Sequence, residues 1–467
     1  MHTGLELASA IKEKKISAVE AVNECLKCIE KTDGQINAFI SVQKESALKR
    51  AQEVQIQIDK GELPSPLAGV PIALKDNITT NGIETTCASK MLKGYRPVFD
   101  AAVVEKLVQA GMIVVGKLNM DEFGMGNTGE TSVFGPVLNP WNISHVAGGS
   151  SGGSTAAVAA GQVPLSLGSD TGGSIRQPCA FCGVTGIKPT YGAVSGYGLI
   201  ACASSLEQIG PVGKNINDCA ALLSIISDAE YPKQKPASKI GLPRNYLNSI
   251  TDGDIKLACE DAAKEFESAG LTIEEFDMPL LDCMLPAYNI ISCAEISSNL
   301  ARFDGLKFGH RSAQAKSLTD VYRFSRGEAF GLEVKKRILF GTLVLSSEFY
   351  DSYYRKALQV RSLVKEAYNR LFEKFDMILS PVAPAAVLLG ENQGRHVEMP
   401  GDIINVSVNL AGLPAVSLPC GLNKQGLPVG FQLIGSAFSE EKLIAAAQIY
   451  QSRTDHHTKK PACGGVS

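Results

Sequence analysis

Two serine clusters set among glycines are the residues of this chain best suited to chemistry. Residues 148–176 read GGSSGGSTAAVAAGQVPLSLGSDTGGSIR, with the serines gathered around Ser150 and Ser174. A serine hydroxyl is a weak nucleophile until a neighbouring base takes its proton. An upstream candidate for that base is Lys75, in the apolar run GVPIALKDN. This pairing predicts a serine nucleophile that a lysine activates.

Lys75 can act as a base only if its pKa falls towards neutrality. A lysine in water has a pKa of ~10.4, and lowering it by about 3 units costs roughly 4 kcal/mol, which desolvation or neighbouring dipoles supply. The apolar residues before Lys75, which are Val70 and residues 72–74, indicate a dry pocket for its amine. The alternative is a lysine that only pairs with Asp76 or Asp121.

The glycines before Ser174 suit the other half of such a site. Glycine lets the chain turn tightly, so that successive backbone N–H groups point into one cavity. Such N–H groups stabilise the oxyanion of a tetrahedral intermediate. We therefore expect an oxyanion hole built from the amides of Thr171, Gly172, Gly173 and Ser174, with an ordinary glycine turn as the alternative.

Other short patterns in the chain are weaker. GGSSG and GSSGG match the G-x-S-x-G nucleophile elbow, but glycine-rich runs match that pattern easily. The single Asp170-Thr171-Gly172 triplet lacks the second carboxylate that an aspartic protease needs. No G-x-x-x-x-G-K-[ST] loop for nucleotides is present.

No metal site is expected from the cysteines or histidines. A zinc site would need the two CxxC pairs, Cys25–Cys28 and Cys179–Cys182, to come together. The first pair falls in a helical pattern that suits core packing instead, and the six histidines lack metal-ligand spacing.

The composition is typical of a globular protein with a sizeable core, with 467 residues, 45% of them hydrophobic and 20% charged. The net charge of −3 argues against a nucleic-acid surface spread over the whole molecule. No run of about 18 apolar residues appears, so no membrane-spanning helix is expected. The start, MHTGLELASAIKEKK, carries charges where a signal peptide has its apolar core. These features predict a cytoplasmic protein with reduced cysteines.

The chain divides into three segments. Residues 1 to about 63 are predicted to be helical, because Thr3 with Glu6 and Ser17 with Glu20 fit capping boxes. From about 67 to 215, β-type runs alternate with helical ones, which indicates an α/β fold. From about 240 to 460 we expect helices over 254–275 and 348–374. Strands are expected there in DMILSPVAPAAV, NVSVNLAGLP and PAVSLPCGL. The connector at 233–239 is short, which favours one domain over 1–467.

Taken together, GVPIALKDN, GGSSGGS and GSDTGGSIRQPCAFCGVTGIKPTYGAVSGYG resemble the amidase signature family. The resemblance implies that family's α/β fold, with a central mixed sheet flanked by helices on both faces. It also implies a Ser–cis-Ser–Lys triad for amide hydrolysis through an acyl-enzyme. Ser174 would be the nucleophile, Ser150 would sit at a cis peptide and relay the proton, and Lys75 would be the base.

Within that family, NLARFDGLKFG, EVKKRILFGTLVLSS and NVSVNLAGLPAVSLPCG resemble the glutamine-hydrolysing subunits of tRNA-dependent amidotransferases. The resemblance implies glutamine as substrate, with Arg337 for its α-carboxylate and Asp402 for its α-ammonium. Gly124 and Phe308 would also adjoin the substrate.

The same resemblance implies a heterotrimer with two partners: a tRNA-binding B subunit that has kinase activity, and a small C subunit. ATP and Mg²⁺ would be used by the complex through a partner. This chain itself would bind no cofactor and no nucleic acid.

Two segments depart from the family pattern. Phe308 stands where tyrosine is usual, and MGNTGE at 125–130 stands where a Met-Gly-Ser-Ser-Thr-Glu-like segment is usual. Two alternatives stay open at this point. One is a stand-alone amidase for small aliphatic or aryl amides, and the other is a non-catalytic scaffold paralogue.

Overall fold

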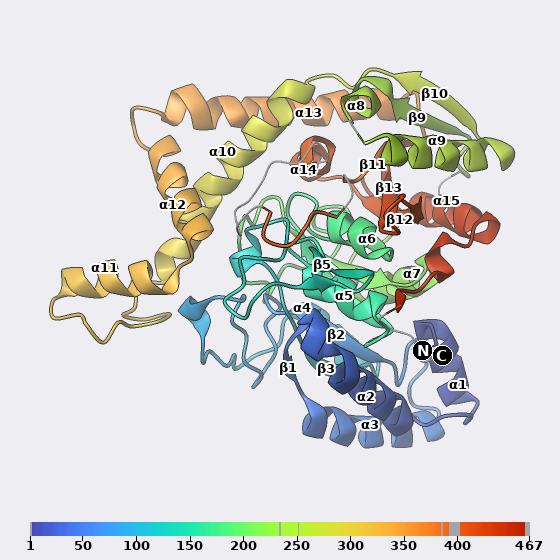
Figure 1. Cartoon of the computed structure of the whole chain (residues 1–467), viewed down its shortest axis with the longest axis horizontal. Helices are drawn as coiled ribbons and strands as arrows, with labels where there is room; N and C mark the ends of the chain where they lie inside the picture. The colour runs from blue at the N-terminus through green and yellow to red at the C-terminus, as the bar shows by residue number, and fades with distance from the viewer. Residues whose placement is uncertain (1, 233–234, 251, 384–385, 392–401, 463–467) are drawn as a thin grey trace.

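An eleven-stranded mixed sheet forms the centre of the computed structural model (Figure 1). The structure describes residues 2–232, 235–250, 252–383, 386–391 and 402–462. The strands run in the order β1-β3-β2-β6-β8-β7-β12-β13-β11-β9-β10. They are β1 (Phe39–Val42), β2 (Pro71–Lys75), β3 (Ile113–Leu118), β6 (Leu165–Asp170), β7 (Thr185–Lys188), β8 (Gln208–Gly213), β9 (Lys239–Pro243), β10 (Thr272–Phe276), β11 (Met377–Pro381), β12 (Ala415–Leu422) and β13 (Pro428–Gly435). A separate pair is formed by β4 (Leu138–Asn139) and β5 (Asn142–Val146).

The sheet mixes parallel and antiparallel pairs. β3, β2 and β6 are parallel neighbours, and so are β11, β9 and β10. The strands between these groups, from β6 through β8, β7, β12 and β13 to β11, pair antiparallel. This confirms the expected α/β class with a central mixed sheet.

Helices surround the sheet, with α2 and α3 against β3, α7 against β8, and α9 and α15 against β13. The α-helices are α1 (Gly4–Lys12), α2 (Ala18–Ile36), α3 (Lys44–Asp59), α4 (Ala102–Gln109), α5 (Gly152–Ala159), α6 (Arg176–Cys182), α7 (Ile216–Ile226), α8 (Arg244–Ser249), α9 (Gly253–Ser268), α10 (Leu281–Asn299), α11 (Leu318–Ala329), α12 (Leu332–Val344), α13 (Arg355–Phe372), α14 (Asp402–Ala411) and α15 (Glu440–Arg453). Short 3₁₀ turns occur at η1 (Lys90–Leu92), η2 (Glu122–Gly124), η3 (Leu300–Arg302) and η5 (His456–Thr458), and a π turn at η4 (Tyr350–Tyr354). Among the described residues, no helix is long and apolar enough to cross a membrane.

The first two helices begin where the sequence predicts. Thr3 and Glu6 form a complete capping box at α1, and Ser17 and Glu20 form one at α2. In each box the side chains satisfy backbone N–H groups that the first helical turn leaves unpaired. β2 and β6 are buried at every residue, as expected for apolar runs in the middle of a sheet.

Two predictions in the C-terminal segment are wrong. NVSVNLAGLP was expected as a strand, but its first part belongs to the helix α14. Residues 404–411 of this helix are all buried, so both its apolar and its polar side chains have partners: Val406 and Val408 join an apolar cluster, while Asn405 and Asn409, four residues apart, contact the buried Arg176. The predicted helix over 254–275 ends at Ser268, and β10 follows it. Part of DMILSPVAPAAV, residues 384–385, lies outside the described residues.

Helices α10 to α13 form an arm that extends from the body of the molecule, at the upper left of Figure 1. α10 packs on α12, α13 and α14. A separate apolar cluster, which includes Phe123, Phe303 and Phe330, joins the base of this arm to η2. Among the described cysteines, Cys283 on α10 is the exposed one.

Candidate active site

Two parallel strands bring the catalytic candidates to one edge of the sheet. β2 and β6 pair in parallel, with Ile72 opposite Leu165, so their carboxyl ends meet. Lys75 is the last residue of β2, and Asp170 is the last residue of β6. Open α/β sheets place ligand sites outside the carboxyl ends of their parallel strands. The loops that carry both serine clusters gather at this edge.

The amine of Lys75 is held by oxygen atoms of neutral groups. Nζ lies 2.7 Å from Ser150 Oγ, 2.8 Å from Ser151 Oγ and 3.2 Å from the carbonyl of Ser169. The side chain is fully buried. Asp76 instead pairs with Lys117 at 3.5 Å, and Lys75 has no ion pair among the residues that the structure describes. The contacts are those of a candidate base, and not those of a structural ion pair.

Burial lowers the pKa of Lys75 to about 8, although the carboxylates of Asp121 and Asp170 oppose this shift. A lysine with that pKa is neutral in roughly a tenth of molecules at pH 7, against fewer than about one in a thousand for a lysine in water. The environment therefore supplies the shift that a lysine base requires.

The two serine segments are tied together through their backbones. The peptide bond between Gly149 and Ser150 is cis, as the family resemblance implies. The N–H of Ser151 donates to the carbonyl of Ser174 at 3.0 Å. α5 begins just after the first segment and α6 just after the second, so each serine lies in a loop that leads into a helix.

The loop after β6 holds one amide internally and leaves others free. Gly173 adopts a φ of +118°, which favours glycine, and its N–H donates to Asp170 Oδ1 at 2.8 Å. This bond removes Gly173 from the expected set of four amide donors. The N–H groups of Thr171, Gly172 and Ser174 have no hydrogen-bond partner within the described ranges. Within the expected oxyanion hole, the amides of Thr171, Gly172 and Ser174 therefore stay available as donors, while that of Gly173 is engaged by Asp170.

A buried charge pair shapes the same loop. Arg176 donates to Asp170 through Nε and Nη2, both at 3.0 Å, and neither side chain is exposed. Burial alone would raise the pKa of Asp170, but Arg176 and the loop amides outweigh burial and lower it. Arg176 also donates to Asn405 and Asn409, so the pair links the loop to α14.

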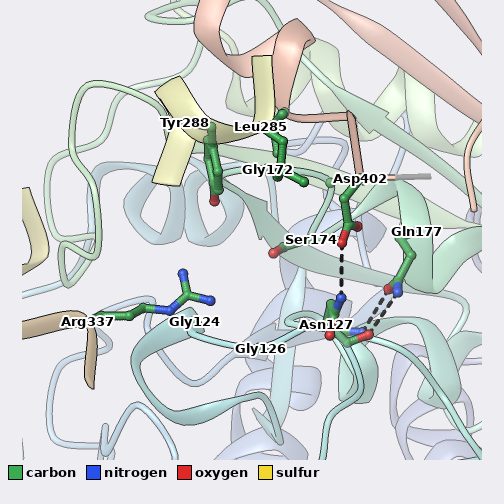
Figure 2. A pocket seen from close by; sticks show the side chains of 13 residues that line it. Gly124, Gly126, Asn127, Gly172, Ser174, Gln177, Leu285, Tyr288, Arg337 and Asp402 are labelled. Atoms are coloured by element: carbon green, nitrogen blue, oxygen red, sulfur yellow. Dashed lines mark hydrogen bonds between the residues drawn. The ribbon is translucent and has the colours of Figure 1, made fainter. Parts of the chain in front are cut away.

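The pocket beside Ser174 brings together residues far apart in the sequence. It is lined by Gly124, Gly126, Asn127, Gly149, Gly172, Gly173, Ser174, Gln177, Leu285, Tyr288, Arg337, Asp402 and Val406. In Figure 2 the hydroxyl of Ser174 lies between the guanidinium of Arg337 on one side and the carboxylate of Asp402 on the other. Arg337 comes from α12 and Asp402 from the start of α14.

Of the two remaining candidates for substrate contact, one lines the pocket and the other does not. Gly124 lines the pocket, and a Cβ there would lie 3.6 Å from Ser150 Oγ, so this wall runs close to the candidate relay serine. Phe308 is not among the lining residues, and its side chain is 57% exposed. The structure thus brings Arg337, Asp402 and Gly124 to the pocket of Ser174 but leaves Phe308 on the surface of the arm.

Sequence reasoning missed several polar residues of the pocket. Tyr288 on α10 is packed so close to Gly172 that a Cβ at that glycine would lie 2.5 Å from the Tyr288 hydroxyl oxygen. Asn127 donates to Asp402 at 3.3 Å, and Gln177 links the carbonyl of Asn127 to the N–H of Gly149. Asn127 belongs to the 125–130 segment that departs from the family pattern, which was its one sequence signal. Gln177 lies within the quoted GSDTGGSIRQP motif, where no role was assigned to it, and Tyr288 had no sequence signal.

The described residues contain no group of three or more His, Cys, Asp or Glu side chains arranged to hold a metal ion. The polar features of the pocket are instead two opposite charges, the hydroxyl of Ser174 and backbone amides.

Comparisons with known proteins agree with this arrangement. Residues 20–444 match the family model described as Amidase. The chain is 51% identical to the A subunit of the glutamyl-tRNA(Gln) amidotransferase of Agathobacter rectalis, over 96% of this chain and 93% of that protein. The crystal structure of the protein of the same name from Thermotoga maritima matches with a TM-score of 0.78 and 36% identity, over 97% of this chain and 95% of that one. The peptide amidase of Stenotrophomonas maltophilia matches with a TM-score of 0.84 and 28% identity, over 97% and 96%.

Proposed function

The chain belongs to the amidase family, and from this we propose that it hydrolyses the side-chain amide of glutamine as the A subunit of a tRNA-dependent amidotransferase. The ammonia would convert Glu-tRNA(Gln) to Gln-tRNA(Gln) on a partner protein, with Asp-tRNA(Asn) as a further acceptor. Because this reaction uses charged tRNA, it belongs in the cytoplasm.

The observation that carries the proposal is the pair of opposite charges on either side of Ser174. Glutamine carries an α-carboxylate and an α-ammonium beyond its amide. Arg337 donates from Nε to Glu333 Oε1 at 2.9 Å and keeps its two Nη atoms for a carboxylate, and Asp402 offers an acid for the ammonium. Both side chains are largely buried, with 11% of Arg337 and 7% of Asp402 exposed. A pocket for a neutral aliphatic or aryl amide has no use for either charge.

The chemistry follows from the contacts of Lys75. Ser174 Oγ attacks the amide carbon while its proton passes through Ser150 to the neutral amine of Lys75. The amides of Thr171, Gly172 and Ser174 stabilise the oxyanion. When the C–N bond breaks, Lys75 returns a proton through Ser150 to the leaving nitrogen, which departs as ammonia.

A water molecule then repeats the sequence on the acyl-enzyme. It attacks the ester carbon as Lys75 takes its proton, the C–O bond to Ser174 breaks, and the proton returns to Ser174 as glutamate leaves. No step in either half requires a cofactor on this chain.

The partners follow from the same proposal. The relatives are named as A subunits of an amidotransferase, and an ammonia-producing chain needs an acceptor protein. We assign tRNA binding and the ATP- and Mg²⁺-dependent activation of the acyl group to a B subunit, and completion of a heterotrimer to a small C subunit.

Ser174→Ala tests the nucleophile, with ammonia release from glutamine as the measurement. The variant should lose activity by at least about a thousandfold, because a serine enzyme has no substitute for its nucleophile. Undiminished turnover of glutamine would remove Ser174 from this role.

A second measurement tests the substrate, by comparing glutamine with propionamide in the presence and absence of the other subunits. We expect a preference for glutamine and stimulation by the partners. Hydrolysis of propionamide alone, without any effect of partners, would instead identify a stand-alone amidase. If neither amide is hydrolysed, the chain is a non-catalytic scaffold.

A further inference from the structure

Helix α12 exposes an apolar stripe to solvent. Leu332, Leu339, Phe340 and Leu343 are between 40% and 71% exposed. They stand at positions i, i+7, i+8 and i+11, which share one face of a helix. Lys336, at i+4, lies on the same face and is also exposed.

The opposite face of α12 is apolar as well and is already packed. Val334 and Val344 are buried, and a Cβ at Gly341 would overlap the carbonyl of Cys293, so α12 and α10 are in close contact. An apolar face of a helix is normally buried against other elements. α10 covers the inner face of α12, whereas the outer face is left uncovered in the isolated chain.

The other long helices do not show this pattern. Three of them each expose a single large apolar side chain: Leu257 on α9, Leu363 on α13 and Ile449 on α15. Single exposed apolar residues are ordinary on protein surfaces, whereas a continuous stripe marks a contact surface. The stripe on α12 is therefore the surface feature that indicates a binding partner.

The segment of chain that contains the stripe is basic. Residues 302–356 contain eleven Lys and Arg against six Asp and Glu, a net charge of +5, while the whole chain carries −3. Lys336 and the exposed Arg323 of α11 have no ion-pair partner within the part of the chain that the structure describes. A complementary surface would be apolar at its centre and acidic at its edge.

The stripe also lies on the same helix that contributes Arg337 to the pocket. The inner side of α12 sends Arg337 into the pocket, and the N–H of Gly331, which precedes α12, donates to Glu122 at 2.9 Å. Glu122 belongs to η2, the same short turn as the pocket residue Gly124. A protein seated on the outer face of α12 would adjoin the site at which ammonia forms.

We propose that the outer face of α12 is the docking surface for the protein that receives the ammonia, which binds through an apolar patch edged by carboxylates. The inference rests on the proposed function. The relatives are named as A subunits, so a chain of this kind needs a protein interface, and this stripe is the candidate that combines apolar area, charge and proximity to the pocket. A lipid surface and a second copy of this chain are the competing occupants.

The test is a binding measurement between the purified chain and the purified B and C subunits of the amidotransferase from the same organism. Leu339→Lys combined with Leu343→Lys places two charges in the stripe, and Leu257→Lys on α9 is the matched control, because Leu257 is 53% exposed. The stripe variant should bind more weakly, with a dissociation constant raised by about tenfold or more, as expected for the centre of an interface. The control should bind like wild type, and the melting temperatures and glutamine turnover of the isolated chains should agree.

Each other outcome overturns the inference in a distinct way. If the stripe variant binds the subunits as tightly as wild type, the interface lies elsewhere and the proposed function stands. If wild type binds neither of them, the proposed function fails with it. If wild type instead binds phosphatidylglycerol vesicles, or forms dimers in ultracentrifugation, and the stripe variant loses that property, the occupant is a membrane or a second copy.

Discussion

At the scale of single residues, the proposed chemistry depends on a lysine whose pKa the fold lowers. Lys75 is surrounded by hydroxyls and a carbonyl, and its pKa falls to about 8 through burial. In the proposed mechanism the neutral amine is the base, so the active fraction of the enzyme should rise with pH and level off above that pKa.

We therefore predict that kcat/KM for glutamine rises roughly 50-fold between pH 6 and pH 8, following the neutral fraction of a group with a pKa of about 8. A pH–rate profile measures this. Burial also raises the pKa of the neighbouring Glu207 to about 7, so Glu207→Gln is the control. The rise should persist in that variant with its midpoint near 8, and a flat profile from pH 6 to pH 8 would contradict a lysine base.

A substitution of Arg337 distinguishes substrate binding from the chemical step. Arg337→Met should raise the KM for glutamine by about 10- to 150-fold, the range expected when a hydrogen-bonded charge partner is lost. Turnover of propionamide, which has no α-carboxylate, should change little. Parallel kinetics on the two amides measure the difference, with Lys336→Met on the outer face of α12 as the control. Equal losses on both amides would mean that Arg337 acts on the fold of the pocket.

At the scale of elements, the pocket depends on how α12 is anchored. Glu122 is 4% exposed, accepts a hydrogen bond from Ser89 Oγ, and accepts another from the N–H of Gly331 ahead of α12. Phe123, next in the chain, packs against Phe303 and Phe330 of the arm. η2 is therefore the joint between the catalytic body and the helix that carries Arg337.

Glu122→Ala should loosen that joint. It removes the carboxylate that accepts from the buried Ser89 hydroxyl and from the partly buried N–H of Gly331, which costs about 1–3 kcal/mol of unfolding free energy. We expect urea unfolding to show this loss and the KM for glutamine to rise while that for propionamide stays near its wild-type value. Glu122→Gln keeps an acceptor for Gly331 and should restore most of both properties. A KM for glutamine unchanged in the alanine variant would refute the anchoring role.

The sequence specifies local elements well and distant contacts poorly. The capping boxes at Thr3 and Ser17 and the buried strand before Lys75 are read correctly because their causes lie within a few residues. α14 is misread because NVSVNL alternates polar and apolar residues as a strand does, although Asp402, Asn405 and Asn409 recur at helical spacing. The contacts of both asparagines with Arg176 explain why these polar side chains are buried.

The same limit applies to the pocket. Tyr288 reaches it from α10, more than a hundred residues after Ser174, and no local pattern marks that approach. The triad candidates carry dense motifs, which are local. The opposite wall is assembled by packing alone, so it becomes visible only in the folded chain. Phe308 shows the converse error, since a difference from the family pattern drew attention to a side chain on the arm surface.

At the scale of the whole molecule, the arm and the body differ in how they are stabilised. β2, β6 and β8 are buried at every residue, whereas α11 and α12 expose several of their largest apolar side chains. Regions with few buried contacts open at lower free energy than the core.

Hydrogen exchange on the isolated chain should therefore be slowest in β2, β6 and β8 and clearly faster in α11 and α12. Binding of the partner subunits should slow exchange in α12 more than in the central strands. Mass spectrometry of peptides from the exchanged protein measures both effects. Exchange in α12 as slow as in β6, without any partner, would show that the arm opens only when the whole molecule unfolds.

The exposed thiol of Cys283 provides a built-in attachment point for a reporter. It lies on α10, two residues before Leu285 and five before Tyr288, both of which line the pocket. In a chain with Cys463, which lies outside the described residues, changed to serine, a maleimide fluorophore should react first at Cys283. Its emission should then shift when glutamine binds to the Ser174→Ala variant, so that occupancy of the site can be titrated without turnover. An unchanged signal at saturating glutamine would mean that α10 does not respond to the ligand.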